Sequence, residues 1–165
     1  MKACAFTGHR NIKPEHRKKL PALLERAISY AYQNGCRVFY AGGAIGFDTE
    51  AARAVIKFRI DHPDVSLVLL LPCINQGERW SASQLSVYEY TLSAANEVEY
   101  ISEEYNDRCL RDRNRALASR CDILIAYLER QNSGAAQTVR MAKSLGKAVY
   151  NLYPTLDGKT AGKKQ

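Results

Sequence analysis

The apolar positions of the chain follow two alternating patterns. Short apolar runs predict six strands, at residues 2–7, 37–41, 65–72, 97–101, 122–128 and 147–152. Apolar residues spaced three and four apart predict the intervening helices, at residues 14–34, 47–60, 83–95, 108–120 and 132–145. Strands that alternate with helices favour an α/β, Rossmann-like three-layer fold with a doubly wound, mainly parallel sheet of about six strands.

Two segments refine this prediction. The run 65–72 is apolar on both faces, as a central parallel strand requires. Pro21 interrupts the pattern at 14–34, so the helix there either kinks or begins again. We expect one domain over residues 1–153 and a flexible basic tail over residues 154–165.

Composition sets the class of protein. With 165 residues, 46% hydrophobic and 25% charged, the chain resembles an ordinary globular domain. No apolar run approaches the roughly 20 residues of a membrane helix, and no secretory signal is visible, so we expect a cytoplasmic protein without a membrane partner. The five cysteines are scattered and form no Cys-x-x-Cys, which favours reduced, buried thiols and no metal site.

The net charge of +7 is concentrated near the N-terminus, where residues 2–26 hold seven Lys and Arg against two acidic residues. A basic balance is compatible with an anionic partner, either a phosphorylated small molecule or a nucleic acid. It is equally compatible with a solvated helix surface. Because no known nucleic-acid-binding motif is visible, nucleic acid is the less favoured partner.

Four turns that follow strands carry unusual residues, and they predict the site. In a doubly wound sheet, ligands bind at the carboxyl ends of the strands, so these turns lie on the relevant edge. The turns hold Thr7-Gly8-His9-Arg10, Gly42-Gly43-Ala44-Ile45-Gly46-Phe47-Asp48, Pro72 with the loop that contains Trp80, and Asn132-Ser133-Gly134-Ala135-Ala136-Gln137-Thr138. We expect the two glycine turns and the arginine to converge on one cleft.

The turn from Gly42 to Asp48 is the strongest of the four. A strand that turns through glycines into a helix presents backbone N–H groups to a phosphate, and the absence of a Cβ lets the anion approach. Asp48 and Glu50 lie in the first turn of the helix that follows. They either cap free N–H groups or accept hydrogen bonds from hydroxyls of the ligand. The alternative is a tight turn that binds nothing.

These motifs together resemble a known family. Thr7-Gly8-His9-Arg10, Gly42-Gly43-Ala44-x-Gly46-x-Asp48, Leu71-Pro72, Trp80, Arg113-Asn114 and Ser133-Gly134-x-x-x-Thr138 are similar in order and spacing to the YpsA-like branch of the SLOG superfamily. This superfamily includes the DNA-processing protein DprA and the LOG nucleotide hydrolases. The resemblance covers residues 1–152 and implies a Rossmann-like fold that binds nucleotides or nucleotide-derived ligands.

Residue chemistry and this resemblance together suggest roles for the other turns. Ser133, Gly134 and Thr138 are candidates for a second anion-binding turn, and Arg10 for a bidentate phosphate clamp. Thr7 and Gly8 would bring the first turn close to the ligand. Trp80 either stacks on a base or packs over the sheet edge. Arg113 would reach the cleft and Asn114 would cap or contact the ligand, whereas a lone His9 beside a turn is more often structural than a general acid.

A reaction is the most open question. The resemblance to LOG enzymes implies cleavage of a nucleotide N-glycosidic bond, which in that family uses a glutamate at the last glycine turn. The segment 132–141 has no glutamate, so Asp48 and Glu50 are the only acidic residues placed to act as catalysts. Binding is therefore favoured over catalysis.

Three functions remain open. The first is a binding protein for a nucleotide or an ADP-ribose-like ligand, acting as a sensor or regulator. The second is a nucleotide N-glycosidase or phosphohydrolase. The third is single-stranded DNA binding like that of DprA, through the basic first helix. No cofactor is expected beyond a nucleotide-like ligand, and the resemblance suggests a homodimer.

Overall fold

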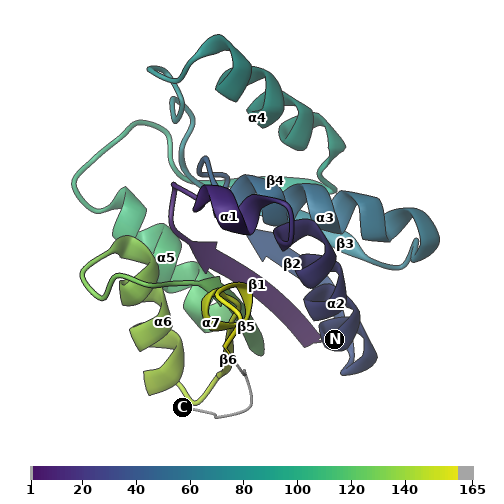
Figure 1. Cartoon of the computed structure of the whole chain (residues 1–165). Coiled ribbons are helices and arrows are strands. Elements are labelled where there is room, and N and C mark those ends of the chain that lie inside the picture. The colour runs from purple at the N-terminus through teal and green to yellow at the C-terminus, as the bar shows by residue number, and fades with distance from the viewer. Residues whose placement is uncertain (1, 160–165) are drawn as a thin grey trace.

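The computed structural model describes residues 2–159 and contains one sheet of six parallel strands (Figure 1). Across the sheet the order is β4-β3-β2-β1-β5-β6. The strands are β1 (Lys2–Gly8), β2 (Cys36–Ala41), β3 (Ser66–Cys73), β4 (Glu97–Ser102), β5 (Ile123–Tyr127) and β6 (Ala148–Asn151). The predicted α/β, Rossmann-like fold with a parallel doubly wound sheet is confirmed.

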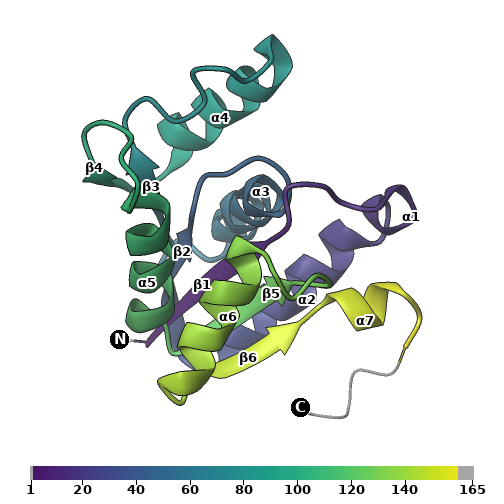
Figure 2. The ribbon, with the colours of Figure 1, turned by 90° about the vertical axis from the view of Figure 1, so that its left-hand side faces the viewer.

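Helices cover both faces of the sheet, as Figure 2 shows. The helices are α1 (Pro14–Arg17), α2 (Leu20–Gln33), α3 (Phe47–Asp61), α4 (Ala82–Ala94), α5 (Cys109–Arg120), α6 (Gly134–Ser144) and α7 (Tyr153–Leu156). Helices α2 and α3 lie on one face, with α4 beside α3, and α5 and α6 lie on the other face. None of the helices within residues 2–159 has the length and apolar character needed to cross a bilayer.

The alternation of side chains along each strand builds two separate cores. In β1, Cys4 and Phe6 pack into the core under α2 and α3, while Ala5 packs under α5 and α6. The first core is rich in aromatic rings, and Phe6, Phe39 and Phe47 form its centre. The second core is built from smaller residues, so α5 and α6 pack close to the sheet. All five cysteines are buried and free, as predicted.

The strand order reverses direction next to β1. The chain passes from β1 to β2, β3 and β4 along one half of the sheet, and α5 then carries it back to β5 on the other side of β1. In register, Gly8 at the end of β1 is opposite Tyr127 at the end of β5. The carboxyl ends of β1 and β5 therefore flank the topological switch point, where open α/β sheets bind ligands.

The segment 14–34 forms two helices instead of one. Helix α1 ends at Arg17, and α2 begins at Leu20 with Pro21 in its first turn. Proline lacks an N–H and is tolerated in a first turn, where no intrahelical acceptor is available. Pro21 thus starts a new helix, which was one of the two outcomes expected from the sequence.

The boundary predicted at residue 154 is too early. Tyr153–Leu156 forms α7, and both terminal residues of this helix are buried against the first core. His16 of α1 contacts Asp157 through Nε2 and the Tyr127 hydroxyl through Nδ1 at 2.8 Å. These contacts attach α7 to the rest of the fold, so the packed domain extends past residue 153. The remaining part of the predicted tail, residues 160–165, lies outside the described residues.

Candidate functional site

The turn from Gly42 to Gly46 leads from β2 into α3 and requires glycine at two positions. Gly43 and Gly46 have φ angles of 75° and 87°, in the left-handed region that favours glycine. A Cβ on Gly46 would overlap the backbone carbonyl of Arg10, and one on Gly43 would overlap the side chain of Leu71. The turn is therefore packed between the turn after β1 and the end of β3.

Helix α3 begins without a side-chain cap. The N–H of Phe47 donates to the carbonyl of His9 at 3.1 Å, and Glu50 continues the helix by donating to Gly46. Within residues 2–159, no acceptor faces the N–H groups of Asp48 and Thr49. The start of α3 thus keeps free donors and the positive end of the helix dipole at the carboxyl edge of the sheet.

Asp48 lies beside this turn, and its carboxylate is close enough to the guanidinium of Arg113 of α5 for each charge to shift the pKa of the other. Oδ2 of Asp48 accepts a hydrogen bond from the N–H of Ala44 at 3.3 Å, and Arg113 Nη1 donates to the carbonyl of Gly42. A Cβ on Gly42 would lie 2.7 Å from Arg113 Nη1 and 2.8 Å from Asp48 Oδ2. Glycine is therefore needed here because the carboxylate and the guanidinium occupy the space a side chain would fill.

Both charges are buried, with exposed fractions of 5% for Asp48 and 7% for Arg113. Burial raises the pKa of Asp48 to about 6, although Arg113 and the Ala44 N–H oppose the shift. Burial likewise lowers the pKa of Arg113, against the attraction of Asp48. For both groups burial outweighs the attraction between the two charges, and perturbed groups of this kind are typical of functional sites.

Oδ1 of Asp48 is buried and has no hydrogen-bond partner among residues 2–159. A buried acceptor without a partner costs about 1–3 kcal/mol. Within the described residues, this oxygen is thus a buried acceptor that no protein group satisfies.

The second glycine turn is connected to the first through α5. Arg113 Nε donates to Asn114 Oδ1 at 3.0 Å, and Asn114 Nδ2 faces the carbonyl of Gly134 at 3.5 Å. The structure thus brings both glycine turns together on the carboxyl edge. Arg113 and Asn114 lie between them and occupy part of the space expected for a cleft.

At the start of α6, the side chains of Ser133 and Thr138 form hydrogen bonds within the turn. Ser133 Oγ accepts from the N–H of Ala136 at 3.2 Å and donates to the carbonyl of Arg130. Thr138 is fully buried, and its hydroxyl donates to the carbonyl of Gly134 at 3.1 Å. These contacts explain why a serine and a threonine stand here without any ligand.

The turn after β1 joins the site from the other side. Thr7 is buried, and a Cβ on Gly8 would overlap the ring of Phe47. His9 accepts hydrogen bonds at Nε2 from the N–H groups of Glu129 and Arg130, at 2.8 and 3.1 Å. Arg10 is exposed, and its positive charge opposes part of the rise in the pKa of Asp48 that burial causes.

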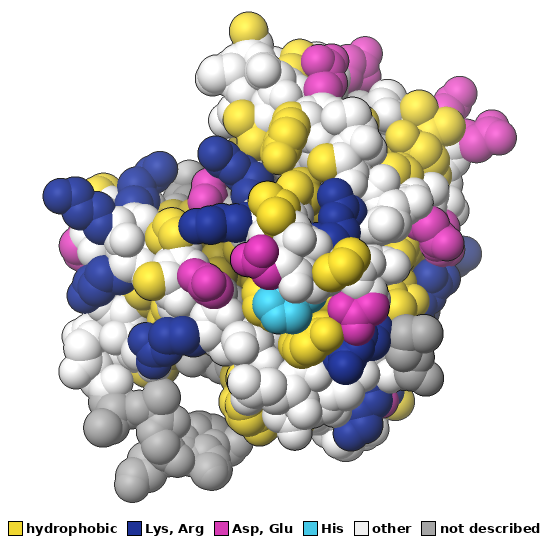
Figure 3. All heavy atoms as spheres, turned by 90° about the vertical axis from the view of Figure 1, so that its right-hand side faces the viewer, with side chains coloured by type: hydrophobic (Ala, Val, Ile, Leu, Met, Phe, Trp, Pro, Cys, Tyr) yellow, Lys and Arg dark blue, Asp and Glu magenta, His cyan; other side chains and the backbone are white. Residues whose placement is uncertain are grey.

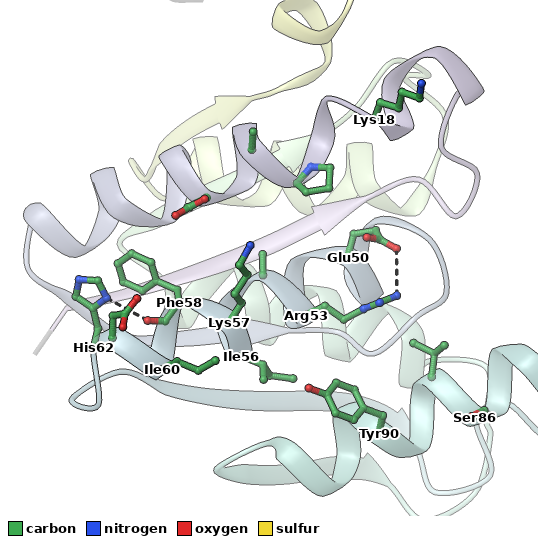
Figure 4. A pocket seen from close by; sticks show the side chains of 16 residues that line it. Lys18, Glu50, Arg53, Ile56, Lys57, Phe58, Ile60, His62, Ser86 and Tyr90 are labelled. Carbon is green, nitrogen blue, oxygen red and sulfur yellow. Dashed lines mark hydrogen bonds and ion pairs between the residues drawn. The ribbon is translucent and has the colours of Figure 1, made fainter.

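The side chains of two predicted residues take no part in the contacts of the glycine turns. Glu50 lines a groove of about 930 Å³ between α2, α3 and α4, where its carboxylate lies 4.0 Å from Arg53 (Figure 4). Figure 3 shows the side of the molecule on which α2 and α3 lie in Figure 1, with hydrophobic side chains among charges of both signs.

Trp80 packs edge-on against Tyr88 at 5.1 Å and over Gly77, so packing accounts for it.

One polar contact at the turn has no signal in the sequence. Gln76 Nε2 lies 3.3 Å from both the carbonyl of Gly43 and the hydroxyl of Tyr88, and thereby links the glycine turn to the loop after β3. No spacing or motif marks a glutamine in a polar loop, so only the folded chain reveals this role. Within residues 2–159, no group of three or more His, Cys, Asp or Glu side chains is placed to hold a metal ion.

Comparisons with a family model and with known sequences point to one family. The YpsA model, described as the YspA SLOG family, matches residues 4–154. UPF0398 proteins of Bacillus thuringiensis strain Al Hakam and Bacillus cereus strain AH187 are each 24% identical over 156 residues. Those alignments cover 88% of this chain and 85% of each relative.

Solved structures share the fold. DNA processing protein A from Helicobacter pylori, described with a single-stranded DNA binding mode, has a TM-score of 0.62 and 22% identity over 90% of this chain. DprA from Streptococcus pneumoniae has a TM-score of 0.64 and 18% identity over 92% of this chain. The match covers 63% and 50% of those two chains. The present chain therefore spans half to two thirds of the DprA chains it resembles.

Proposed function

The chain belongs to the YpsA-type SLOG family, and from this premise we propose that it binds a nucleotide or a nucleotide derivative at the carboxyl edge of β2. The phosphate would lie at the start of α3, near the free N–H groups and Arg10. A ribose hydroxyl would donate to Asp48. Binding of such a ligand suits a sensor or regulator.

The observation that carries this proposal is the partnerless Oδ1 of Asp48 beside an uncapped helix start. A phosphate alone would be repelled by a carboxylate, so the pair of features suits a ligand with both an anion and a hydroxyl donor. Nucleotides and ADP-ribose carry both groups within a few bonds of each other. A free phosphate would satisfy only the N–H groups.

Calorimetric titration with nucleoside monophosphates, NAD and ADP-ribose tests the proposal. Asp48→Asn should weaken binding by about tenfold or more, because a charge-assisted hydrogen bond is removed. Glu50→Gln is the matched control, since it removes a carboxylate two residues away that lines the groove instead. Equal affinity in both variants, or no binding of any of these ligands to the unmodified chain, would contradict the proposal.

Hydrolysis of the bound nucleotide is tested in the same samples. Release of free base or ribose phosphate would make the protein an N-glycosidase, and Asp48 would be the candidate carboxylate to direct water. Glu50 lines the α2–α3–α4 groove instead, so it would not share this task. Turnover that persists in Asp48→Asn would exclude this role for Asp48.

Single-stranded DNA binding is the second candidate, and the DprA-like fold and the exposed arginines of α5 support it. Arg108, Arg111 and Arg115 are exposed and share one face by their spacing. Affinity for an oligonucleotide should then fall steeply with salt, and Arg111→Gln with Arg115→Gln should lower the salt slope by about one for each phosphate that is no longer neutralised. Absence of binding at low salt would remove this candidate.

A further inference from the structure

A second cavity of about 220 Å³ lies on the carboxyl edge, at the ends of β1 and β5. These two strands flank the position where the strand order reverses. The cavity is lined by His9, Asn11, Lys13, Tyr127, Glu129, Arg130 and Tyr153. Of these residues only His9 also contacts the start of α3, where its backbone carbonyl accepts the N–H of Phe47, and the proposed nucleotide would not occupy the cavity.

The protonation state of His9 follows from its hydrogen bonds. Nε2 accepts from two backbone N–H groups, so this nitrogen carries no proton. Burial and the nearby charge of Arg130 lower the pKa of His9, which favours the neutral ring. The single ring proton therefore lies on Nδ1. This N–H is buried and has no partner among residues 2–159, and the ring lines the cavity.

A second buried group without a partner faces the same region. Tyr153 is 6% exposed, and its hydroxyl has no hydrogen-bond partner that meets normal geometry among the described residues. The side chains of Lys13 and Glu129 lie near this hydroxyl and shift the pKa of Tyr153 in opposite directions. Lys13 Nζ lies 5.3 Å from the centre of the Tyr153 ring. Within the lining, Lys13 and Arg130 provide two positive charges and Glu129 one negative charge, while Asp157, outside the lining and 3.9 Å from Lys13 Nζ, offsets part of the Lys13 charge.

The walls of the cavity are held in place by other contacts. The Tyr127 hydroxyl accepts a hydrogen bond from the N–H of Lys13 at 3.1 Å and contacts His16 Nδ1 at 2.8 Å. His16 in turn contacts Asp157, which lies 3.9 Å from Lys13 Nζ. The donors are therefore arranged before any ligand arrives, which lowers the entropic cost of binding.

We propose that this cavity is a binding site for a small oxyanion, of the phosphate or carboxylate class. The N–H of His9 Nδ1 and the hydroxyl of Tyr153 donate to the anion, and Lys13 and Arg130 balance its charge. Glu129 is the one acidic group in the lining, and the two cations outweigh it. A volume of about 220 Å³ corresponds to roughly seven water molecules at about 30 Å³ each, which is room for a small anion but not for a whole nucleotide.

Imidazole nitrogen NMR tests this site directly, because the chain has three histidines and only His9 lines the cavity. Inorganic phosphate and succinate are titrated separately, which distinguishes the two sources of an oxyanion. One of them should shift the Nδ1 signal of His9 in a saturable manner, while the signals of His16 and His62 move little. If neither anion shifts the His9 signal, or if the shift rises without saturation, the proposal is wrong.

Variants separate the cavity from the nucleotide site. The double variant Lys13→Gln/Arg130→Gln should lower the affinity for the anion by about tenfold or more and leave the backbone contacts of His9 in place. Lys143→Gln removes one positive charge from an exposed position on α6 outside both cavities and should change affinity less than twofold, because the charge is screened. If both variants lowered the anion affinity equally, the effect would come from net charge alone and the proposed site would be wrong.

Asp48→Asn keeps the two proposals distinguishable. It should weaken nucleotide binding and leave the His9 response to the small anion unchanged. Failure of the nucleotide titrations would therefore leave the cavity proposal standing, and the reverse also holds. If Asp48→Asn abolished the His9 response, the anion would be binding at the start of α3 and the cavity site would be rejected.

Discussion

The two glycine turns on the carboxyl edge begin their helices in opposite ways. Ser133 caps α6 through its side chain, and the buried Thr138 bonds back to Gly134, so every polar group named there has a partner. Helix α3 starts at Gly46 without a side-chain cap, beside a buried carboxylate oxygen that lacks a partner. The same sequence feature, glycine after a strand, serves two different purposes.

This difference favours the turn at Gly42–Gly46 as the place of the proposed ligand. At the α6 turn the side chains of Ser133 and Thr138 are hydrogen-bonded within the turn, and helix capping explains them. The turn at Gly42–Gly46 differs because it contains a buried carboxylate oxygen without a partner and a buried arginine nearby, which cost stability unless a ligand or a partner group compensates. We therefore place the candidate ligand at the start of α3 and regard α6 as its support.

The largest effect is expected at Arg113, the residue that joins the two turns. Arg113→Met removes a buried donor to the Gly42 carbonyl and the positive charge near the buried Asp48 carboxylate, and should cost about 3–5 kcal/mol of unfolding free energy, measured by urea denaturation. Arg115→Met removes an exposed arginine of the same helix and should cost within about 0.5 kcal/mol. Adding Asp48→Leu to Arg113→Met should recover much of the stability, because no buried charge then remains unpaired. A small effect of Arg113→Met alone would mean that Arg113 does little to stabilise the buried Asp48 carboxylate and the Gly42 turn.

The glycines themselves give a direct test of the comparison. Gly46→Ala should cost about 3 kcal/mol or more, since φ is positive and the new Cβ would overlap the Arg10 backbone. A Cβ on Gly134 meets only Asn114 Nδ2, at an ordinary 3.5 Å. Gly134→Ala should therefore be neutral or stabilise α6 by up to about 1 kcal/mol, as alanine favours a helix. Similar costs in urea denaturation would show that the two turns are equivalent.

The pH dependence of stability isolates Asp48. Its pKa is raised from 3.8 to about 6, so its native-state stabilisation is complete below pH 3.8 and is lost as the pH rises through 6. Relative to Asp48→Asn, the unmodified chain should therefore lose unfolding free energy between pH 4 and pH 7, by at most about 3 kcal/mol for a shift of roughly two units. Urea denaturation of both chains at several pH values measures this difference. A difference that is constant with pH would contradict a buried, perturbed carboxyl.

Ligand affinity should move in the opposite direction. Asp48 accepts a hydrogen bond from a hydroxyl more strongly when it is ionised, so affinity for ADP-ribose should rise as the pH passes 6 and become independent of pH in Asp48→Asn. ADP-ribose is preferred to a nucleoside monophosphate here because the terminal phosphate of the monophosphate itself titrates near 6. The same calorimetric titration, repeated at each pH, provides the measurement.

Local patterns predicted the parts of the fold that depend on local sequence. The six strands, the glycine turns and the position of Asp48 follow from apolar runs and from turn residues. Asp48 and Glu50 could not be separated in this way. Residues two apart on a helix differ by about 200° in direction, so one carboxylate enters the site and the other enters the groove.

Long-range contacts account for what the sequence did not reveal. His16 and Asp157 are 141 residues apart, and nothing in either segment marks them as partners. The apolar pair Tyr153 and Leu156, three residues apart, was the available signal that the chain packs beyond residue 153. Trp80 illustrates the opposite case, because a single aromatic residue near an edge suits both stacking on a base and packing on Tyr88.

The smallest effect expected is at the cap of α6, and it separates support from function. Ser133→Ala removes the bond to the Ala136 N–H and should cost about 1 kcal/mol in urea denaturation. If α6 only supports the site, affinity for ADP-ribose should stay within about twofold, because the donors at α3 are untouched. Ser133→Asp, which restores a capping acceptor but adds a negative charge, should recover the stability. Weaker affinity in Ser133→Ala together with full stability would instead make Ser133 a ligand contact, and the two turns would then share one anion.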